Sequence, residues 1–551
     1  MAMTGAQILV ALLERHGVRW VAGIPGGAIL PVYDALGRSS IRHILCRHEQ
    51  AAGFVAQGFA RATGEIGVCL ASSGPGATNL LTAVADAMRD SIPLLVITGQ
   101  VPRPLLGTDA FQEIDTCGLA RCVTKYSALV RSADELPGIF AKAMTEALSG
   151  RPGPVWIDIP KDVQTETGGV LPQASDGLEA RYRLAADQNL IMEAAHAIEQ
   201  AASPILYLGG GLVHANAGEA ARELAERQDI PAVMTLMALG ILPKEHPLSL
   251  GMPGMHGAQA THKALQEADL LVALGARFDD RVTGRLKDFC PQARVIHVDI
   301  DRRELGKLRV PQIAIEGDLG DVLARLLALL GSRRRTAWRT RIQALRQSHP
   351  VCEHNAAEAR RLLLEIADAA PHDAIIATDV GQHQMWVAQH YPVRGPRRWL
   401  TSGGLGTMGF GLPAAIGAAL ARPQHPVICI TGDGSLLMNI QELATAVEYG
   451  VDVKVVVMDN QSLGLVAQQQ AMFYDKRLFG SQYATATDFV AIARGFGVAA
   501  FDWDIEGREP HFWRDVLAMP GPCLVQAHIR SGAHVLPIVP PGAAHWQAVG
   551  S

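Results

Sequence analysis

The chain has 551 residues, which is more than one hydrophobic core usually organises, so two to four domains are expected. Hydrophobic residues make up 48% of the sequence and charged residues 19%, as is typical of a globular protein with an ample core. The net charge of −5 argues against nucleic-acid binding, and no apolar run reaches the roughly 20 residues that span a bilayer, which argues against a membrane protein.

The first predicted element is an amphipathic helix over residues 1–17. Its sequence, MAMTGAQILVALLERHG, has no basic start and no small-residue cleavage site, so we expect no signal peptide. The eight cysteines are scattered and include no CxxC pair, a pattern that favours reduced thiols over a disulfide framework or a zinc site. Both observations favour a soluble, cytoplasmic enzyme.

The next notable segment is RHEQAAGFVAQGFAR at residues 47–61, which predicts a helix rich in small residues. Glu49 lies near its start, where an acidic side chain most often only complements the helix dipole. The small residues along the helix permit another segment to approach it closely.

Short β-branched runs alternate with Ala- and Leu-rich helical segments along the whole chain. In order, these runs are VCLAS, LLVITG, VWIDIP, ILYLGG, LLVALG, VIHVDI, AIIATD, VICITGDG, VKVVVMDN and CLVQAH. Apolar runs that are bounded by Gly or Asp and separated by helices indicate buried parallel strands. The predicted fold class is therefore α/β, with doubly wound parallel sheets.

Two composition shifts interrupt this alternation. Residues 164–189 are polar and lack a clear period, and residues 333–360 are charged. Interpreted as linkers at 166–189 and 333–360, they predict an N-terminal domain at 1–165, a central domain at 190–332 and a C-terminal domain at 361–551. The basic stretch RRRTAWRTR, at 333–341, is interpreted as a solvated face rather than a nucleic-acid surface.

Two glycine-rich motifs are weak signals on their own. The triplet GGG at 209–211 is more often only a turn. The segment GLGTMG at 404–409 fits the GxGxxG pattern of dinucleotide-binding folds. However, it follows no unambiguous strand and has no clearly placed ribose-binding acid, so a dinucleotide site is not favoured there.

Polar residues end two successive predicted strands, VICI and VKVVVM. Asp433 follows the first and Asn460 the second, at the edge of a parallel sheet where ligands bind. A carboxylate and an amide oxygen suit Mg²⁺, which completes its shell with water and phosphate oxygens. Gly432 and Gly434 allow close backbone approach, and Ser435 can cap the next helix, whose N-terminus would face a phosphate. The alternative is a plain turn with Asp as a loop residue.

The spacing of these residues carries a resemblance to a known family. Gly-Asp-Gly followed by 25 residues and Asn resembles the thiamine diphosphate signature of the pyruvate-decarboxylase-like superfamily. Collinear segments over nearly the whole chain look like acetohydroxyacid (acetolactate) synthase, most closely the catalytic large subunit of the bacterial isozyme I type. Among them are SSGPGATNL, GTDAFQEID, GRPGPVWIDIPKDVQ, GARFDDRVTG, TDVGQHQMW and VLPIVPPGAA.

The resemblance implies an enzyme of branched-chain amino acid biosynthesis with three domains. It implies decarboxylation of pyruvate and ligation of the hydroxyethyl carbanion to a second pyruvate or to 2-ketobutyrate. The implied cofactors are thiamine diphosphate, Mg²⁺ and, because of the RFDDR segment, FAD in the central domain. The implied assembly is a homodimer or homotetramer with a possible small regulatory subunit.

The resemblance also assigns cofactor-binding residues by position. The implied metal ligands are Asp433, Asn460 and the backbone carbonyl of Ser462. The residues implied to meet thiamine diphosphate are Val380, Gly381, Gln382, His383, Gly406, Met408, Gly432, Asp433, Gly434, Ser435, Asn460, Leu463 and Gly464. The residues implied to hold FAD are Arg151, Gly209, Gly210, Gly211, Thr235, Leu236, Met237, Gly254, Met255, His256, Arg277, Asp279, Asp299, Gly317 and Asp318.

Implied catalytic roles fall on a further set. Glu49 promotes the aminopyrimidine tautomer that deprotonates the thiazolium C2, and Met408 supports the thiazolium ring. Phe111 and Gln112 line the active site, and Lys161 lies at the substrate channel. Arg281 binds the carboxylate of the second 2-keto acid, and Gln469 bears on the choice of acceptor.

This chain departs from the family pattern at two positions. Gln469 replaces the Trp of the usual Gln-Trp-Gln, so we expect weak discrimination between pyruvate and 2-ketobutyrate. Asp459 replaces the first Asn of the usual Asn-Asn pair, and the metal site should survive because Asn460 is the ligand. The C-terminal VLPIVPPGAA segment and the Gln468 loop are expected to close over the site and exclude water.

Two alternatives remain open. A related thiamine enzyme, such as a pyruvate oxidase or sulfoacetaldehyde acetyltransferase, would keep Glu49 and Gly-Asp-Gly without needing RFDDR. A non-catalytic binding paralogue would retain the fold, although the presence of Glu49, Gln112, Lys161 and Arg281 argues against it.

Overall fold

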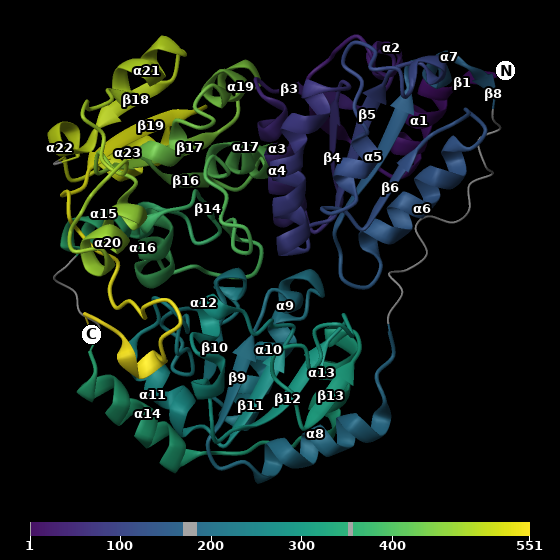
Figure 1. The fold of residues 1–551 in the computed structure, drawn as a ribbon. Helices are drawn as coiled ribbons and strands as arrows, with labels where there is room; N and C mark the ends of the chain where they lie inside the picture. Colours follow the sequence, from purple (N-terminus) through teal and green to yellow (C-terminus); the bar gives the residue numbers. More distant parts are fainter. Residues whose placement is uncertain (1, 169–183, 351–355, 508, 551) are drawn as a thin grey trace.

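The computed structural model describes residues 2–168, 184–350, 356–507 and 509–550. Its main strands form three parallel sheets, each flanked by helices, and the ribbon shows them as three units (Figure 1). The predicted fold class of three doubly wound parallel-sheet domains is confirmed. Most of the predicted first linker, residues 169–183, lies outside the described residues.

The N-terminal unit contains six parallel strands in the order β3-β2-β4-β5-β7-β6. They are β2 (Trp20–Gly23), β3 (Arg42–Leu45), β4 (Gly67–Ala71), β5 (Leu94–Gln100), β6 (Tyr126–Leu129) and β7 (Pro154–Pro160). The helices are α1 (Gly5–Arg15), α2 (Leu30–Leu36), α3 (Glu49–Thr63), α4 (Pro75–Asp90), α5 (Thr116–Ala120), α6 (Leu136–Leu148) and α7 (Lys161–Thr165). An antiparallel pair, β1 (Met3–Thr4) with β8 (Thr167–Gly168), ties the start of the unit to its end.

The central unit contains five parallel strands in the order β10-β9-β11-β12-β13. They are β9 (Pro204–Leu208), β10 (Ala232–Met234), β11 (Leu270–Leu274), β12 (Arg294–Asp299) and β13 (Ile313–Glu316). The helices are α8 (Gln188–Gln200), α9 (Gly211–His214), α10 (Gly218–Gln228), α11 (Gln259–Glu267), α12 (Asp280–Thr283), α13 (Leu319–Leu329) and α14 (Thr336–Ser348).

The C-terminal unit contains six parallel strands in the order β15-β14-β16-β17-β19-β18. They are β14 (Ile375–Thr378), β15 (Trp399–Leu400), β16 (Val427–Gly432), β17 (Val453–Asp459), β18 (Ala499–Asp502) and β19 (Cys523–His528). The helices are α15 (Ala357–Ala369), α16 (Gln382–His390), α17 (Gly411–Ala421), α18 (Asp433–Leu436), α19 (Glu442–Glu448), α20 (Gly464–Phe473), α21 (Phe489–Gly495), α22 (Trp503–Glu506) and α23 (Phe512–Ala518).

The apolar runs predicted as strands are all strands, and most of them are buried along their whole length. Every residue of β4, β5, β7, β9 and β11 is buried, as in sheets that carry helices on both faces. The hydrophobic residues are thus concentrated in the sheets. Within the described ranges, no helix has the length and apolar character needed to cross a membrane.

The N-terminal and C-terminal sheets share one strand order, and equivalent helices of the two units pack together. α3 and α17 each join the second strand of their unit to the third, and they lie side by side at the boundary between the units (Figure 1). A Cβ on Gly58 would lie 2.0 Å from the Ala414 carbonyl oxygen, and one on Gly417 would lie 1.9 Å from that of Val55. The two glycines therefore let the helix backbones touch, which confirms the close approach expected of the Glu49 helix.

The basic stretch at 333–341 is exposed over most of its length, as predicted, but Arg335 is not. Arg335 is 4% exposed and donates to the carbonyl oxygens of Ile198 and Ala201, at the end of α8, and of Gln228, at the end of α10. A guanidinium is stabilised at helix C-termini, where unpaired carbonyls carry partial negative charge. The interpretation as a solvated face therefore fails at Arg335 alone among the arginines of this stretch, because the sequence pattern does not distinguish it from its neighbours.

Part of the predicted second linker is also structured. Residues 336–348 form α14, whose Trp338, Ile342 and Leu345 are buried in the core of the central unit. This helix therefore extends the central unit beyond residue 332, while residues 351–355 of the same predicted linker lie outside the described part of the chain.

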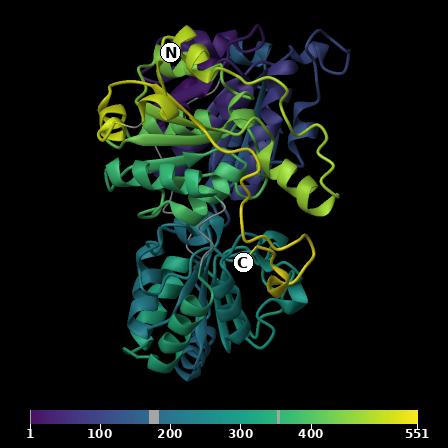
Figure 2. The ribbon, with the colours of Figure 1, turned by 90° about the vertical axis from the view of Figure 1, so that its left-hand side faces the viewer.

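The C-terminal segment leaves the C-terminal unit and crosses to the central one (Figure 2). The Val539 N–H donates to the Met255 carbonyl at 2.8 Å, and the Arg285 N–H donates to the Ala543 carbonyl at 2.9 Å. The ring of His545 stacks on that of His262 with 4.1 Å between centroids. The last residues thus join the two units rather than extending the final strand.

Candidate functional site

The chain reverses its winding direction at β14 of the C-terminal sheet. β14 lies between β15 and β16, which are the next two strands along the chain, so these two strands lie on opposite sides of β14. In doubly wound sheets, ligands bind at this reversal, beyond the carboxyl ends of the strands. Val380–His383 follow β14 and Asp433 follows β16, so both predicted motifs lie at the reversal. Asn460 follows the next strand, β17.

The side chains of Asp433 and Asn460 converge on one backbone N–H. The Ser462 N–H donates to Asp433 Oδ2 at 3.0 Å and to Asn460 Oδ1 at 3.2 Å, and the Ser462 hydroxyl donates to the same Asn460 oxygen at 3.0 Å. Gln461, which lies between Asn460 and Ser462, adopts φ 55°, a left-handed conformation that sharply turns the chain. Oxygens that share a donor lie close enough to bind one hard cation, so the three residues fit Mg²⁺.

The ionisation of Asp433 reflects its enclosed position. Burial, together with the nearby Asp459 carboxylate, raises the pKa of Asp433 to about 7. A divalent cation bound to the Asp433 carboxylate would favour its charged form and so lower its pKa. Asp459 itself accepts from the Gln461 N–H of the following turn at 3.0 Å and from the Gln526 amide of the neighbouring strand β19 at 2.8 Å.

The surroundings of Asp433 also fit an anionic group. His383 is 5% exposed, and its Nε2 has no hydrogen-bond partner within the described ranges. A buried nitrogen without a partner is rare in native proteins, and a phosphate oxygen would satisfy it. α16, α18 and α20 all begin at this edge, so several helix N-termini lie near it.

Glycines keep the same space open. A Cβ on Gly464 would lie 2.2 Å from Gln382 Oε1, and one on Gly434 would lie 2.5 Å from the Tyr483 hydroxyl. Leu463 precedes α20 and is half-buried beside Gly434. The helix α18 begins within Gly-Asp-Gly, at Asp433, and is only one turn long. Ser435 is its third residue, and its hydroxyl caps the helix start by accepting from the Gly432 N–H at 3.2 Å.

Glu49 is the first residue of α3, at the carboxyl edge of the N-terminal sheet. It is half-buried, and its Oε2 accepts from the Asn79 amide of α4 at 2.9 Å. The same edge carries Gln112, which adopts φ 61° and whose carbonyl oxygen would lie 2.8 Å from a Cβ on Gly74, the residue before α4. Lys161 begins α7 directly after β7.

The predicted catalytic residues therefore fall into two groups in a single chain. Among the described residues, no hydrogen bond or ion pair joins Glu49 to Asp433, Asn460 or Ser462. Phe111, which was predicted to line the site, is 88% exposed on the surface of the N-terminal unit.

A cavity of about 820 Å³ lies between the central unit and its two neighbours. It is lined by Arg281, Gln469 and Gly406 together with most residues predicted to hold FAD. Those FAD-assigned residues are Arg151, Gly209, Gly210, Gly211, Thr235, Leu236, Met237, Met255, His256, Arg277, Asp279, Asp299 and Asp318. Gly254 and Gly317 do not line it; they pack against Arg281 and Ala186 instead. Met408 is half-buried in the loop that follows Gly406.

The cavity lies at the winding reversal of the central sheet, between β9 and β11. A Cβ on Gly209 would lie 2.0 Å from the Gly275 carbonyl oxygen, so only glycine lets the loops after these two strands pack together. Asp299 ends β12 and is 9% exposed, and burial raises its pKa to about 6. A buried carboxylate at a strand end can bind ribose hydroxyls, and the arginines can bind phosphates, so the donor set fits a flavin dinucleotide.

Several residues of the cavity and its rim carry no sequence signal. Asp90, His214 and Glu304 line the cavity but come from separate segments of the N-terminal and central units. Gln468, predicted to belong to a closing loop, lies instead in helix α20 and is 1% exposed. Its side chain accepts from the Val535 N–H at 2.8 Å and donates to the Val535 carbonyl at 2.9 Å. The predicted closing loop and the C-terminal segment are thus joined directly.

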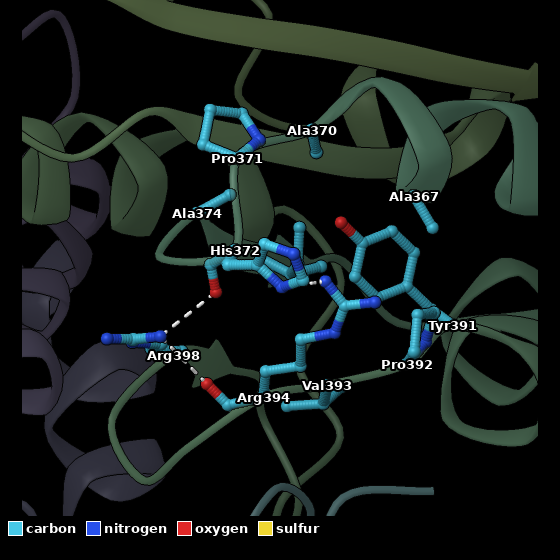
Figure 3. Close-up of a pocket in the computed structure, with 11 residues that line it drawn as sticks. Ala367, Ala370, Pro371, His372, Ala374, Tyr391, Pro392, Val393, Arg394 and Arg398 are labelled. Carbon is cyan, nitrogen blue, oxygen red and sulfur yellow. Dashed lines mark hydrogen bonds between the residues drawn. The ribbon is translucent and has the colours of Figure 1, made fainter. Parts of the chain in front are cut away.

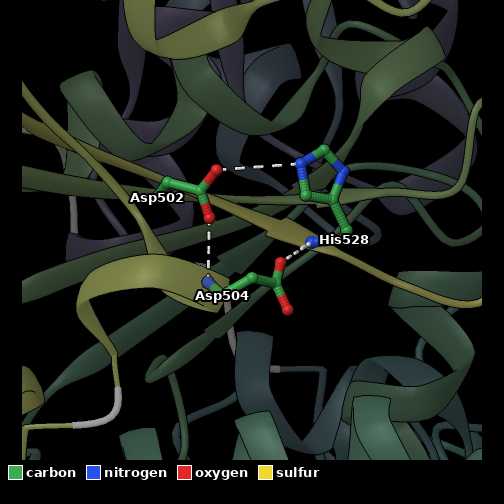
Figure 4. A group of neighbouring side chains, drawn as sticks. All are labelled: Asp502, Asp504 and His528. Atoms are coloured by element: carbon green, nitrogen blue, oxygen red, sulfur yellow. Dashed lines mark hydrogen bonds and ion pairs between the residues drawn. The ribbon is translucent and has the colours of Figure 1, made fainter.

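Two other surface features lie outside the set of residues predicted for the site. A pocket of about 10 Å³ beside Ala374 contains Arg394 and Arg398, but Arg398 is engaged by the carbonyls of His372 and Arg394, and the space holds no more than a water molecule (Figure 3). Asp502, Asp504 and His528 form an exposed cluster (Figure 4). There Asp502 accepts from the Asp504 N–H at 2.8 Å and Asp504 accepts from the His528 N–H at 3.0 Å, so both carboxylates stabilise local backbone.

Comparison with known proteins agrees with this arrangement. Models of the thiamine pyrophosphate enzymes match the chain in order: the N-terminal TPP binding domain at residues 3–119, the central domain at 191–326 and the C-terminal TPP binding domain at 379–527.

Full-length relatives agree as well. The acetolactate synthase isozyme 1 large subunit of Escherichia coli (strain K12) is 53% identical over 551 residues, covering 99% of this chain and 98% of the relative. The acetolactate synthase large subunit of Parasynechococcus marenigrum (strain WH8102) is 48% identical, covering 100% and 91%. The isozyme 2 large subunit of Escherichia coli (strain K12) is 46% identical, covering 98% of each chain.

Proposed function

The chain belongs to the acetolactate synthase large-subunit family and is a thiamine pyrophosphate-dependent enzyme of that type; we propose that it decarboxylates one pyruvate and transfers the two-carbon unit to a second 2-keto acid. With pyruvate as acceptor the products are 2-acetolactate and CO₂, and with 2-ketobutyrate they are 2-aceto-2-hydroxybutyrate and CO₂. The convergence of Asp433 and Asn460 on the Ser462 N–H, beside the unpartnered His383 Nε2, carries this proposal.

The residues of the C-terminal unit hold the cofactor. Asp433, Asn460 and the Ser462 carbonyl bind Mg²⁺, while His383 and the helix N-termini around it bind the diphosphate. When bound, thiamine diphosphate supplies the electron sink for decarboxylation. Gln468, held by Val535, closes this side of the site and excludes water.

Other residues handle the proton and the acceptor. The Glu49 carboxylate holds a proton at a nitrogen of the aminopyrimidine ring, because a carboxylate can exchange a proton with such a nitrogen. Arg281 lies at the cavity with its side chain 64% exposed, where its guanidinium is available to bind the carboxylate of the second 2-keto acid in a bidentate manner. Gln112 and Lys161 belong to the N-terminal part of the site.

We propose a homodimer in which each site takes Glu49 from one subunit and Asp433 from the other. Phe111 and Phe479, 88% and 89% exposed, are apolar surfaces that such contact would bury. Since the relatives are named large subunits, a small regulatory subunit is proposed as a further partner. The cysteines of the described ranges are all free, which supports a reducing, cytoplasmic location.

The product of pyruvate turnover tests the reaction. Purified protein is incubated with pyruvate, thiamine diphosphate, Mg²⁺ and FAD, and acetolactate is assayed by acid conversion to acetoin. We expect acetolactate to form without consumption of an electron acceptor, and we expect a flavin absorbance that pyruvate does not bleach, because the flavin does no redox work in the overall reaction. Acetate or acetyl phosphate with a bleached flavin would instead identify an oxidase.

The acceptor preference is expected to depend on Gln469. This residue and Arg281 line the same cavity, so the side chain at 469 contacts the space beside the acceptor. In a competition assay we expect weak discrimination between pyruvate and 2-ketobutyrate. Gln469→Trp should raise the preference for 2-ketobutyrate about tenfold, because the larger ring packs against its extra methylene.

Val466→Trp is the matched control for that substitution. Val466 lies on the same helix, α20, is 48% exposed and does not line the cavity. We expect it to leave the product ratio unchanged. A strong 2-ketobutyrate preference in the unmodified protein would contradict the role of Gln469.

A further inference from the structure

Glu442 is a buried carboxylate outside every motif that the sequence singled out. It is the first residue of α19, and its side chain is fully buried, with 0% exposure. α19 belongs to the C-terminal unit and lies beside the region where β3 leads into α3 (Figure 1). Burying a carboxylate is costly unless hydrogen bonds or a cation compensate it, so its partners indicate what it holds.

The partners of Glu442 are the residues directly before Glu49. Its Oε1 accepts from the Arg47 N–H at 2.9 Å and from the His48 N–H at 3.1 Å, and its Oε2 accepts from the Thr445 hydroxyl at 2.6 Å. Burial raises the pKa of Glu442, and these hydrogen bonds oppose the rise. Two consecutive backbone amides of the N-terminal unit are therefore fixed by one side chain of the C-terminal unit.

Neighbouring contacts extend the same arrangement. The Leu45 N–H donates to the Tyr449 hydroxyl at 2.7 Å, and the Asn439 amide donates to Gln50 Oε1 at 3.2 Å. The segment from Leu45 to Gln50 is thus held on both sides of Glu49 by residues in and around α19. β3 ends at Leu45, so sheet hydrogen bonds no longer constrain the backbone of Arg47 and His48.

We propose that Glu442 is a positioning residue for Glu49. By accepting the Arg47 and His48 amides it fixes the backbone at the start of α3, and thereby the place where the Glu49 carboxylate meets the aminopyrimidine ring. The inference rests on the proposed role of Glu49. A displacement of about 1 Å at a reacting group can cost about 100-fold in rate. Glu442 fixes the amide of His48, the residue next to Glu49, so its loss is expected to displace the Glu49 carboxylate and slow catalysis.

The first test needs no cofactor and no turnover. Amide hydrogen–deuterium exchange is measured over residues 45–52 of the cofactor-free protein. We expect Glu442→Ala to speed exchange at Arg47 and His48 by about tenfold, because both amides lose their acceptor. Glu442→Gln should retain most of the protection, because its amide oxygen can still accept.

Glu448→Ala is the matched control. Glu448 ends the same helix and pairs with the side chain of Arg47, not with its backbone, and its own side chain is 43% exposed. We expect it to leave both amide exchange and kcat within about twofold of the unmodified protein.

The second test asks whether Glu442 acts through Glu49. We expect Glu442→Ala to lower kcat about 10- to 100-fold with little change in KM for pyruvate, and Glu442→Gln to restore most of the loss. In a Glu49→Gln background the same Glu442→Ala change should cost less than about threefold, because residues that act through one another are not additive. A full multiplicative cost in that background would overturn the proposal.

If Glu442→Ala does not fold, Glu442→Gln and Glu442→Asp decide the question. Gln reaches the two amides and Asp falls one methylene short, so Gln should exceed Asp in both kcat and amide protection. Equal values for the two variants would overturn the proposal. These outcomes are separate from the proposed reaction, which stands or falls with acetolactate formation by the unmodified protein.

Discussion

Glu49→Gln is expected to lower kcat by about 10³-fold, within the range that loss of a general acid–base group produces. Glutamine has the same length and can still accept the hydrogen bond that Asn79 donates at 2.9 Å, so α3 should keep its position. It cannot exchange a proton with a nitrogen of the aminopyrimidine ring, which is the role proposed for the carboxylate. The rate of acetolactate formation under saturating cofactor measures the effect.

Cofactor binding should survive the same substitution. The residues proposed to hold the diphosphate and Mg²⁺ lie in the C-terminal unit, whereas Glu49 begins a helix of the N-terminal unit. Titration of thiamine diphosphate by calorimetry should therefore give an affinity within about threefold of the unmodified protein. Glu65→Gln, which alters an exposed carboxylate paired with Arg19 at 3.7 Å, should change neither quantity. Near-normal turnover by Glu49→Gln would refute the role of this residue.

The strands that the sequence predicted are those that the core buries on both faces. The missed strands are short or lie at sheet edges: β15 has two residues, β10 has three, and β3 and β6 are only partly buried. An edge strand faces solvent on one side, so its composition does not form an apolar run. These strands exist because a neighbouring strand supplies their hydrogen-bond partners, and a local sequence pattern does not contain that information.

The residues of the candidate site also divide into those that a local sequence pattern identifies and those whose partners only the fold brings together. Residues in one short run with Asp433 or Glu49 could be assigned by resemblance, because their spacing along the chain is distinctive. Glu442 and Asp90 could not, because their partners lie hundreds of residues away or in another unit. Asp90, for example, accepts from the Gly403 and Gly404 N–H groups and from the Arg61 guanidinium. Buried charges of this kind acquire a role only when the fold brings their partners together.

Arg335 shows why composition was misleading. In sequence it is one of several adjacent arginines, and a charge run is usually exposed. The fold selects this one because α8 and α10 both end beside it and present unpaired carbonyls. Its neighbours Arg339 and Arg341 pair with Asp229 and Glu267, although the Arg341 side chain remains 51% exposed.

Asp433→Ala is expected to weaken Mg²⁺-dependent binding of thiamine diphosphate by at least about 100-fold and to abolish measurable acetolactate formation. The substitution removes the only charged ligand of the proposed metal site. The turn at Ser462 should persist, because its N–H can still donate to Asn460 Oδ1 at 3.2 Å. Calorimetric titration with thiamine diphosphate and Mg²⁺ measures the loss, and removal of Mg²⁺ by a chelator should have the same effect on the unmodified protein.

Asp504→Asn is the control for a carboxylate near the same sheet. Asp504 accepts the His528 N–H at 3.0 Å in the exposed cluster of Figure 4, and Asn can accept it equally well. We expect unchanged cofactor affinity and activity. If Asp433→Ala kept its affinity while Asp504→Asn lost it, the metal site would have to be reassigned to the exposed cluster.

Two inactive variants together should recover activity if the site lies between subunits. Glu49→Gln and Asp433→Ala chains are coexpressed with different affinity tags, and the mixed dimer is isolated through both tags. One of its two sites then combines Glu49 of the Asp433→Ala chain with Asp433 of the Glu49→Gln chain, so about half of the wild-type activity per dimer is expected. A site built within one chain would leave both halves of the mixed dimer inactive. Recovery therefore distinguishes the two arrangements, because neither variant regains activity with its own kind.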